Sequence, residues 1–206
     1  MNTMTTLSKL TDRKREAILQ AAIAEFRSNG FEATSMDKIA ASAEVSKRTV
    51  YNHFPSKDDL FAAILQQLWE CTVAVTESAY RKDLPLRSQL LELMQQKMRM
   101  LSDASFMNLA RVVIAEGIHS PQRAQDMIAR MGRREEGFTA WIRAAQQDGK
   151  LKSADPEFAA HLLQGQLKLF AFWPQLALGQ APLADAEQAM IVQTAVDMFL
   201  AYFERQ

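Results

Sequence analysis

The sequence is poor in turn-forming residues, with seven glycines and six prolines among 206 residues. Average usage of about 7% glycine and 5% proline would give roughly twice as many. So few turn residues do not suit a sheet of many short strands, and we expect long helices instead. Apolar residues make up 48% of the chain and charged residues 23%, which is the composition of a globular protein with a substantial core.

The sequence also lacks a cysteine pair, a signal peptide and a membrane-spanning segment, and these features bear on its cellular location. The single cysteine, Cys71, has no partner for an intrachain disulfide, and we interpret it as a packing or surface thiol. The polar N-terminus lacks the apolar segment of a signal peptide. The densest apolar run, residues 169–173, is far shorter than the roughly 20 residues that span a bilayer. We therefore expect a cytoplasmic protein without a membrane partner.

The common catalytic motifs are also absent: the sequence has no G-x-S-x-G, H-E-x-x-H, P-loop or G-x-G-x-x-G pattern. Glu116 and His119 form one Glu-x-x-His motif of the kind that di-iron helix bundles use. Those sites need a second such motif, whereas His161 stands four residues after Glu157. We expect no enzyme activity, no metal and no cofactor. The alternatives are a metal- or ligand-binding helix bundle without DNA binding, and a structural adaptor.

Apolar residues at helical spacing predict a first helix over residues 11–29, which Gly30 ends. Residues 34–37 resemble a capping box that opens a short helix, with Thr34 at the N-cap position and Asp37 where Glu or Gln is usual. A second short helix covers about 47–53 with Ser46 as its N-cap. Two short helices joined by a turn of three to four residues, and braced by a first helix, form a helix-turn-helix unit.

The rest of the chain predicts longer helices, and Pro174 should bend or end one of them early. We expect these helices over residues 57–80, 85–101, 104–117, 121–147, 155–178 and 183–204. The fold class is therefore all-α with about nine helices. A change in helix length and charge divides the chain into a helix-turn-helix domain, residues 1–57, and a larger helical domain, residues 58–206.

The second short helix has the polar surface that nucleic-acid binding requires. At 100° per residue, one arc of about 140° holds Lys47, Arg48, Tyr51 and Asn52, while Val50 faces the opposite side. Two cations, a phenol and an amide can bind base edges and phosphates. A solvated helix face would give the same pattern, so helix geometry alone leaves both interpretations open.

Neighbouring residues and the charge distribution favour DNA. Thr34 and Ser35 can offer hydroxyls at a helix start, and His53 and Lys57 extend the polar surface. The whole chain has zero formal net charge, but residues 1–57 hold nine Lys and Arg against six Asp and Glu. The remaining residues hold fifteen against eighteen, so the positive share lies at the helix-turn-helix end.

Three segments resemble the N-terminal domain of TetR/AcrR-type transcriptional regulators: ATSMDKIA at 33–40, VSKRTVYNHF at 45–54 and KDDL at 57–60. The resemblance covers about residues 12–62. It implies that the recognition helix contacts double-stranded DNA through Lys47, Arg48, Thr49, Tyr51 and His53. It also implies that Thr34, Ser35 and Lys57 bind the DNA backbone. The family commonly has glycine where this chain has Glu44. If the turn needs a positive φ, the non-glycine residue lowers the stability of the fold by about 1 kcal/mol.

The C-terminal part is informative about assembly. Apolar stripes on the last two predicted helices suit either a core or an interface. The resemblance implies a homodimer through these two helices, and two-fold symmetry would double the length of DNA that is read as a palindromic operator.

The middle helices are rich in methionine and aromatic residues, which suit an adaptable apolar pocket as well as a core. The candidate effector-binding residues are Trp69, Met94, Met98, Phe106, Phe138, Trp141 and Phe170. The resemblance implies that a small, largely apolar effector enters this domain, changes the spacing of the two DNA-binding heads and releases a repressor from its operator.

Overall fold

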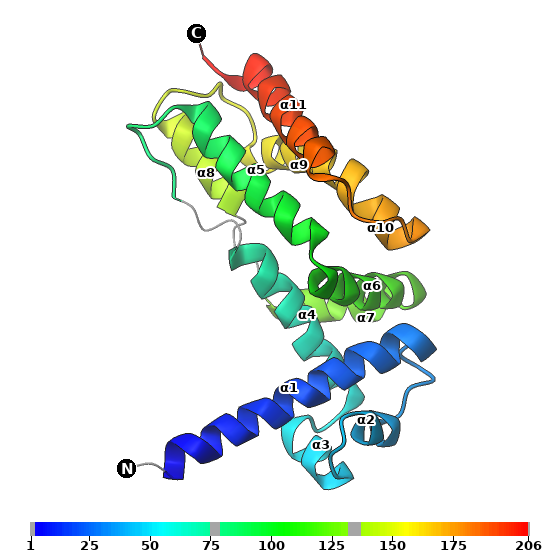
Figure 1. Cartoon of the computed structure of the whole chain (residues 1–206). Coiled ribbons are helices and arrows are strands. Elements are labelled where there is room, and N and C mark those ends of the chain that lie inside the picture. Colours follow the sequence, from blue (N-terminus) through cyan, green and yellow to red (C-terminus); the bar gives the residue numbers. More distant parts are fainter. Residues whose placement is uncertain (1–2, 75–78, 132–136, 206) are drawn as a thin grey trace. The chain divides into compact units, whose positions relative to one another are not determined.

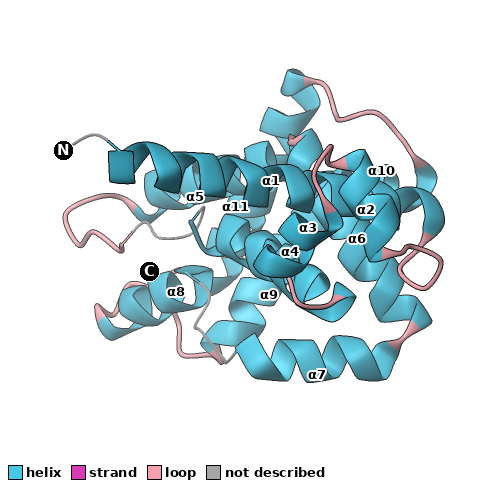
Figure 2. Cartoon of the chain, turned by 90° about the horizontal axis from the view of Figure 1, so that it is seen from below, coloured by secondary structure: helices cyan, strands magenta, loops and turns pink. Residues whose placement is uncertain are grey.

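The all-α fold is confirmed by a computed structural model of the chain (Figure 1). The structure describes residues 3–74, 79–131 and 137–205. Within these ranges the regular elements are helices, and the only strand-like pairing is an isolated bridge between Leu151 and Glu204 (Figure 2). No helix in the described ranges is both long and apolar enough to cross a membrane.

The three N-terminal helices are α1 (Thr3–Asn29), α2 (Met36–Ser42) and α3 (Lys47–His53). Gly30 ends α1 as predicted, with a φ of 79° and a hydrogen bond from its N–H to the Phe26 carbonyl. The predicted start of α1 at residue 11 is wrong, because the helix already begins at Thr3. The opening of α2 is also corrected: Ser35, not Thr34, is its N-cap and accepts from the Lys38 N–H at 3.2 Å.

The turn between α2 and α3 has the geometry of a Schellman motif. The Val45 N–H donates to the Ala40 carbonyl at 3.0 Å, and the Glu44 N–H donates to the Ala41 carbonyl at 3.1 Å. This pattern needs a left-handed residue after the helix, and Glu44 supplies it with a φ of 54°. Glu44 is the only non-glycine residue with a positive φ in the described part of the chain. The expected strain at this departure from the family pattern is therefore present.

The next four helices begin at or next to their predicted first residues; they are α4 (Lys57–Ala74), α5 (Leu86–Ser102), α6 (Ala104–His119) and α7 (Pro121–Met131). No separate start was predicted for α8 (Gly137–Gln147), which lies in the later part of the helix predicted over residues 121–147. The predicted helix over 57–80 is too long at its end, because residues 79 and 80 are not helical. Its residues 75–78, and residues 132–136 of the predicted 121–147 helix, lie outside the described ranges.

The predicted helix over residues 155–178 is interrupted near Pro174. Regular helix α9 (Pro156–Leu167) gives way to a π-helical segment η1 (Lys168–Phe172), and α10 (Trp173–Leu178) follows. Proline has no N–H to donate to the preceding turn, so an irregular segment before it is expected. The buried Gln175 amide donates to the carbonyls of Ala171 and Leu101 and satisfies both.

The chain packs into two compact units, whose boundaries fall within α4 and α6. The first unit contains Met1–Leu68 and Asn108–Gly132, and the second contains Trp69–Met107 and Arg133–Gln206. The first unit therefore combines the three N-terminal helices with most of α4, the later part of α6, and α7. The predicted division at residue 57 separates a DNA-binding segment from a segment for effector binding and dimerisation. It does not follow the packed units, and it stays a prediction.

A continuous apolar core holds the first unit together. Helices α1, α2 and α3 contribute Ile18, Ile39 and Val50, which have no exposed surface. The later part of α6 adds Leu109 and Val112 to the same core. The placement of α2 and α3 consequently depends on residues more than 50 positions further along the chain.

The second unit is built around α5, α8, α9 and α11 (Asp185–Phe203). Arg87 of α5 binds both carboxylate oxygens of Asp197 of α11, at 2.7 and 3.2 Å. The Tyr80 hydroxyl donates to Asp148 at 2.7 Å, and burial together with this carboxylate raises the pKa of Tyr80 to about 12.

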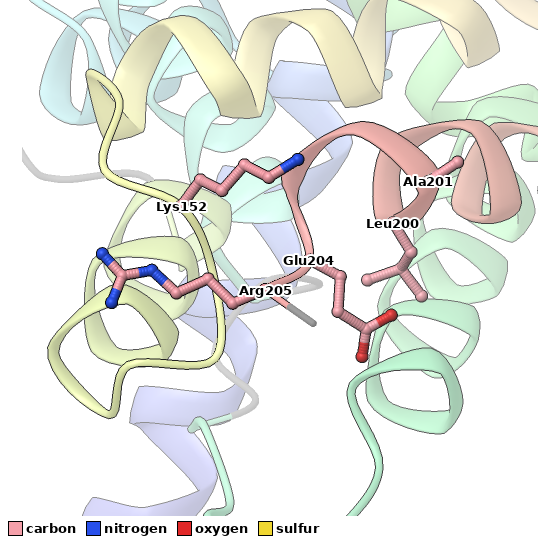
Figure 3. Close-up of a pocket in the computed structure, with 5 residues that line it drawn as sticks. All are labelled: Lys152, Leu200, Ala201, Glu204 and Arg205. Atoms are coloured by element: carbon pink, nitrogen blue, oxygen red, sulfur yellow. The ribbon is translucent and has the colours of Figure 1, made fainter.

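The end of α11 is fastened to the loop that follows α8. The Lys152 N–H donates to the Phe203 carbonyl at 2.7 Å, and the Arg205 N–H donates to the Lys150 carbonyl at 3.0 Å. The Lys152 side chain also reaches the Tyr202 carbonyl at 2.5 Å. Lys152 and Arg205 line a surface pocket next to this junction (Figure 3). These bonds fix the C-terminal end of the helix against its own unit.

Replacing Glu44 by glycine should stabilise the protein by about 0.5–1 kcal/mol, because glycine adopts a positive φ without a Cβ clash. Glu44→Ala removes the same side chain but keeps the Cβ, and it should bring no such gain. Urea denaturation of the full chain measures both changes. A Glu44→Gly protein no more stable than Glu44→Ala would contradict strain at this turn.

Candidate DNA-binding surface

The recognition helix predicted from the sequence is α3, and its start is fixed by Ser46. The Ser46 hydroxyl oxygen accepts from the Thr49 N–H at 3.1 Å and lies 2.8 Å from the Thr49 hydroxyl, which confirms the predicted N-cap. Val50 is fully buried beneath the helix, whereas Arg48 and Asn52 on the other side are exposed. The structure therefore brings the predicted polar residues of α3 onto one accessible face.

Aromatic side chains complete this face. The Tyr51 ring is 49% exposed, which is high for a large aromatic residue and leaves its hydroxyl accessible to a partner. His53 is half-buried, and its ring packs 6.4 Å from the ring of Phe54. Phe54 in turn ends α3 and carries the guanidinium of Arg15 5.0 Å from its ring centroid.

Lys47 is engaged with a carboxylate on the preceding helix. Its ammonium lies 2.5 Å from Asp37, and both side chains are more than half exposed. An exposed ion pair of this kind contributes little to stability. Asp37 does, however, place a negative charge beside a cation that we expect to meet phosphate.

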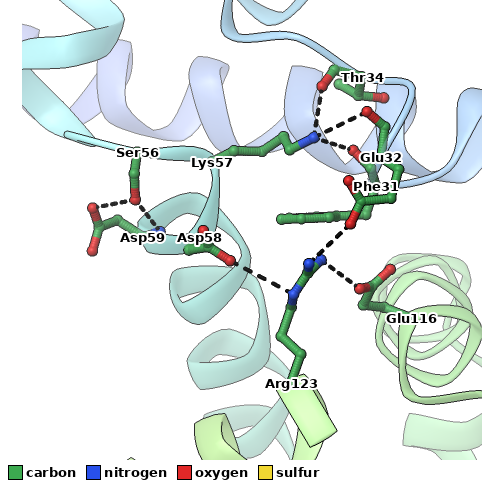
Figure 4. Close-up of polar contacts among 9 residues, drawn as sticks. All are labelled: Phe31, Glu32, Thr34, Ser56, Lys57, Asp58, Asp59, Glu116 and Arg123. Atoms are coloured by element: carbon green, nitrogen blue, oxygen red, sulfur yellow. Dashed lines mark hydrogen bonds and ion pairs between the residues drawn. The ribbon is translucent and has the colours of Figure 1, made fainter. Parts of the chain in front are cut away.

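Two predicted contact residues point into the protein. Thr34 is buried, and its hydroxyl donates toward the carbonyls of Gly30 and Glu25 at 2.8 and 3.2 Å. The Lys57 ammonium donates to the carbonyls of Phe31, Glu32 and Thr34, at 2.6, 3.2 and 3.1 Å (Figure 4). All three ammonium protons thus have protein acceptors. Ser35, by contrast, is exposed at the start of α2.

Sequence reasoning missed Arg123, which lies against the same loop that binds Lys57. Arg123, on α7, lies with its guanidinium 4.4 Å from the Phe31 ring centroid and binds Glu32 and Glu116. No motif or periodicity connects Arg123 with residues that lie some 90 positions earlier. Among the described residues, no group of three or more His, Cys, Asp or Glu side chains could hold a metal ion, and Glu116 is paired with Arg123.

Most of the predicted effector-binding residues lie inside the second unit. Those that are buried are Met94, Met98, Phe106, Phe138 and Trp141, while Trp69 is half-buried. The Trp141 indole N–H donates to the Gln89 amide oxygen at 3.3 Å, so this buried polar group is satisfied. Phe170 stands apart from the set because its ring is 51% exposed.

Phe170 lines an apolar surface groove of about 940 Å³ between α9 and α11. Leu162, Met198 and Tyr202 are exposed along the same groove. Met190 also lines the groove and is exposed. Further large apolar side chains of α9, η1 and α10 are exposed by about half or more; they are Phe158, Leu169, Trp173 and Leu178. A single copy therefore leaves an extensive apolar surface in contact with water.

The chain matches two models of protein families. Residues 18–64 match the bacterial regulatory proteins of the tetR family, and residues 88–205 match the C-terminal domain of AefR-like transcriptional repressors. Together with the helix-turn-helix geometry, these matches define a DNA-binding transcriptional regulator. The chain belongs to the TetR family, as the resemblance predicted.

Known relatives agree in fold and extent. A TetR-family regulator from Pseudomonas syringae pv. tomato, of known crystal structure, is 57% identical, with a TM-score of 0.83 over 95% of this chain and 99% of that one. RutR of Escherichia coli K12 is 27% identical over 86% of this chain and 84% of its own length. The structure of the flavonoid-responsive regulator FrrA is 25% identical, with a TM-score of 0.68 over 95% and 99% of the two chains.

Neutralising Asp37 should strengthen binding to DNA. In Asp37→Asn, Lys47 is free to pair with phosphate, so the slope of log K against log salt should steepen by up to about 0.9. A fluorescent random-sequence duplex measures this slope. The double variant Asp37→Asn/Lys47→Ala is the control and should lose the gain; equal slopes in wild type and Asp37→Asn would contradict the interpretation.

Proposed function

We propose that this protein is a homodimeric repressor that binds a palindromic operator and is released by a small, largely apolar effector. The observation that carries the DNA-binding part is the exposed polar face of α3 above the buried Val50. The proposed direct contacts are Ser35, Lys47, Arg48, Thr49, Tyr51, Asn52 and His53. Thr34 and Lys57 would support them from within the protein.

The proposed homodimer is supported by the groove between α9 and α11. Exposed apolar side chains of this extent are typical of a surface that another protein covers. A second copy is the occupant that fits the function, because one recognition helix reads only a few base pairs and a two-fold dimer places two of them on DNA. Phe170 would then belong to the dimer interface and not to an effector pocket.

The proposed effector is supported by the composition of the second unit. Its interior contains Met94, Met98, Phe106 and Trp141, which are side chains that adapt to an apolar ligand. FrrA, whose fold extends over almost the whole chain, is a flavonoid-responsive regulator. An effector that binds one arrangement of the dimer more tightly than the operator-binding one would release DNA. The match to AefR-like repressors supports repression.

Truncating the recognition helix should remove specific binding without unfolding the protein. Arg48→Ala and Tyr51→Ala should each weaken operator affinity by about 1–3 kcal/mol, or 5- to 150-fold, because each removes a base or phosphate contact. The operator is obtained by selecting bound genomic fragments, and affinity is measured at fixed salt. Arg99→Ala removes an exposed cation on α5 and should leave the affinity unchanged. Wild-type affinity in both α3 variants would exclude α3 as the recognition helix.

A charge in the groove should separate the dimer. Leu162→Glu and Met198→Glu each place a carboxylate where a second copy would bury it, which is strongly unfavourable. Light scattering should show monomers, circular dichroism an unchanged helix content, and operator binding should be lost. Ile118→Glu, at an exposed position of α6 outside the groove, should remain dimeric. Dimeric Leu162→Glu and Met198→Glu proteins would place the interface elsewhere.

A further inference from the structure

The ring of Phe31 lies between two cations in the first unit. The Lys57 ammonium and the Arg123 guanidinium are each 4.4 Å from the ring centroid. Figure 4 shows them on opposite sides of the ring. Because an aromatic face attracts cations, both contacts hold the ring in one orientation. The loop between α1 and α2 is thus fastened from α4 on one side and from α7 on the other.

Arg123 makes three further contacts with its planar side chain. Its guanidinium binds Glu116 of α6 at 2.7 Å, Glu32 of the loop at 2.9 Å, and lies 3.8 Å from Asp58 of α4. We call Phe31, Glu32, Asp58, Glu116 and Arg123 the loop clasp. An ammonium group is a point charge and could not stack on the ring and reach these carboxylates in the same way.

One pair of the clasp, Glu116–Arg123, differs from ordinary surface ion pairs in its burial. The Glu116 side chain is only 5% exposed and that of Arg123 28% exposed, so water screens their attraction weakly. The hydrogen bond from Arg123 lowers the pKa of Glu32 below its ordinary value. The Glu32–Arg123 pair is therefore complete above the ordinary pKa and is lost only as pH falls through the lowered value.

The loop that the clasp holds leads directly into the helix-turn-helix. Phe31 also packs against Phe26 and Phe61, with ring centroids 5.2 and 5.5 Å apart. Four residues later Ser35 caps α2. The buried Ile39 and Val50, and the turn that contains Glu44, then join α2 to α3. A shift of the loop therefore displaces α2 and α3 together relative to α4 and α7.

We propose that Arg123 is a positioning residue for DNA binding, which sets the placement of α2 and α3 through Phe31 and Glu32 without touching DNA itself. This inference rests on the proposed DNA-binding function. It extends the functional head beyond the matched residues 18–64 to a side chain on α7. The clasp also gives a negatively charged side chain, Glu32, a role that favours binding to a polyanion.

Neutralising Glu32 separates positioning from simple electrostatics. Glu32 is exposed, so Glu32→Gln should fold normally. Removing one negative charge would by itself strengthen DNA binding, whereas loosening the loop weakens it. We expect operator affinity to fall about two- to fivefold at fixed salt, against the direction of the charge change. Unchanged or stronger operator binding by Glu32→Gln would overturn the proposal.

Variants of Arg123 separate positioning from stability. Arg123→Ala leaves the buried Glu116 carboxylate without its Arg123 partner, which destabilises the fold, and Arg123→Ala/Glu116→Gln should restore the melting temperature because it removes that charge. We expect both variants to bind the operator at least tenfold more weakly than wild type, with an unchanged salt slope. Arg87→Ala, which removes one positive charge and an exposed Arg–carboxylate pair from the second unit, is the control and should bind normally.

Three other outcomes would contradict a positioning role for Arg123, and a fourth would contradict DNA binding itself. If the double variant regains operator affinity together with its stability, Arg123 acts through stability alone and the proposal is overturned. A salt slope lowered by about 0.9 in Arg123→Ala would make Arg123 a phosphate contact and would equally overturn it. If wild type selects no DNA fragment at all, the proposed function fails first. If wild type binds the operator and every Arg123 variant binds it equally well, the positioning role of Arg123 is refuted, while the proposed DNA-binding function stands.

Discussion

The placement of α2 and α3 depends on the hydrogen bonds between the Lys57 ammonium group and main-chain carbonyls of the loop between α1 and α2. Lys57, the first residue of α4, donates to three carbonyls between Phe31 and Thr34. The six-residue loop between α1 and α2 exposes carbonyls that need donors, and a lysine with three protons satisfies three of them at one point. The loop is thereby fixed to α4, and α2 and α3 follow from it. Direct phosphate contact by Lys57 would have to break these bonds.

The first unit also includes later parts of the chain. Leu109 and Val112 complete its apolar core, and Arg123 holds the Phe31 ring from the side opposite Lys57. Helices α4 and α6 each contribute residues to both packed units. Continuous main chain in α4 and α6 therefore connects the second unit to the unit that supports α2 and α3.

Sequence reasoning was accurate where local physics decides the structure. The bounds of α3, the N-cap at Ser46 and the left-handed end of α1 at Gly30 follow from residue chemistry within one or two turns. It was less accurate at the start of α1 and at the opening of α2, where Thr34 is drawn inward by carbonyls of Gly30 and Glu25. Local patterns cannot distinguish a hydroxyl that caps a helix from one that turns into the core.

Contacts between distant segments were out of reach of the sequence. Arg123 and Glu32 are 91 residues apart, and neither belongs to a motif. Likewise, the apolar spacing of residue 170 is equally compatible with core, pocket and interface, and only the fold places Phe170 on the open groove. Tertiary packing, which decides between these fates, is not encoded in the helical period of a single segment.

The most direct test of the account is hydroxyl-radical footprinting of the wild-type protein on a genomic fragment that it selects. We predict two protected regions related by two-fold symmetry, on one side of the duplex, with centres about one helical turn or a small multiple of it apart. Such a pattern requires two copies of α3 held at fixed spacing. Uniform protection without a preferred sequence, or a single unpaired protected region, would contradict a dimeric operator-binding regulator.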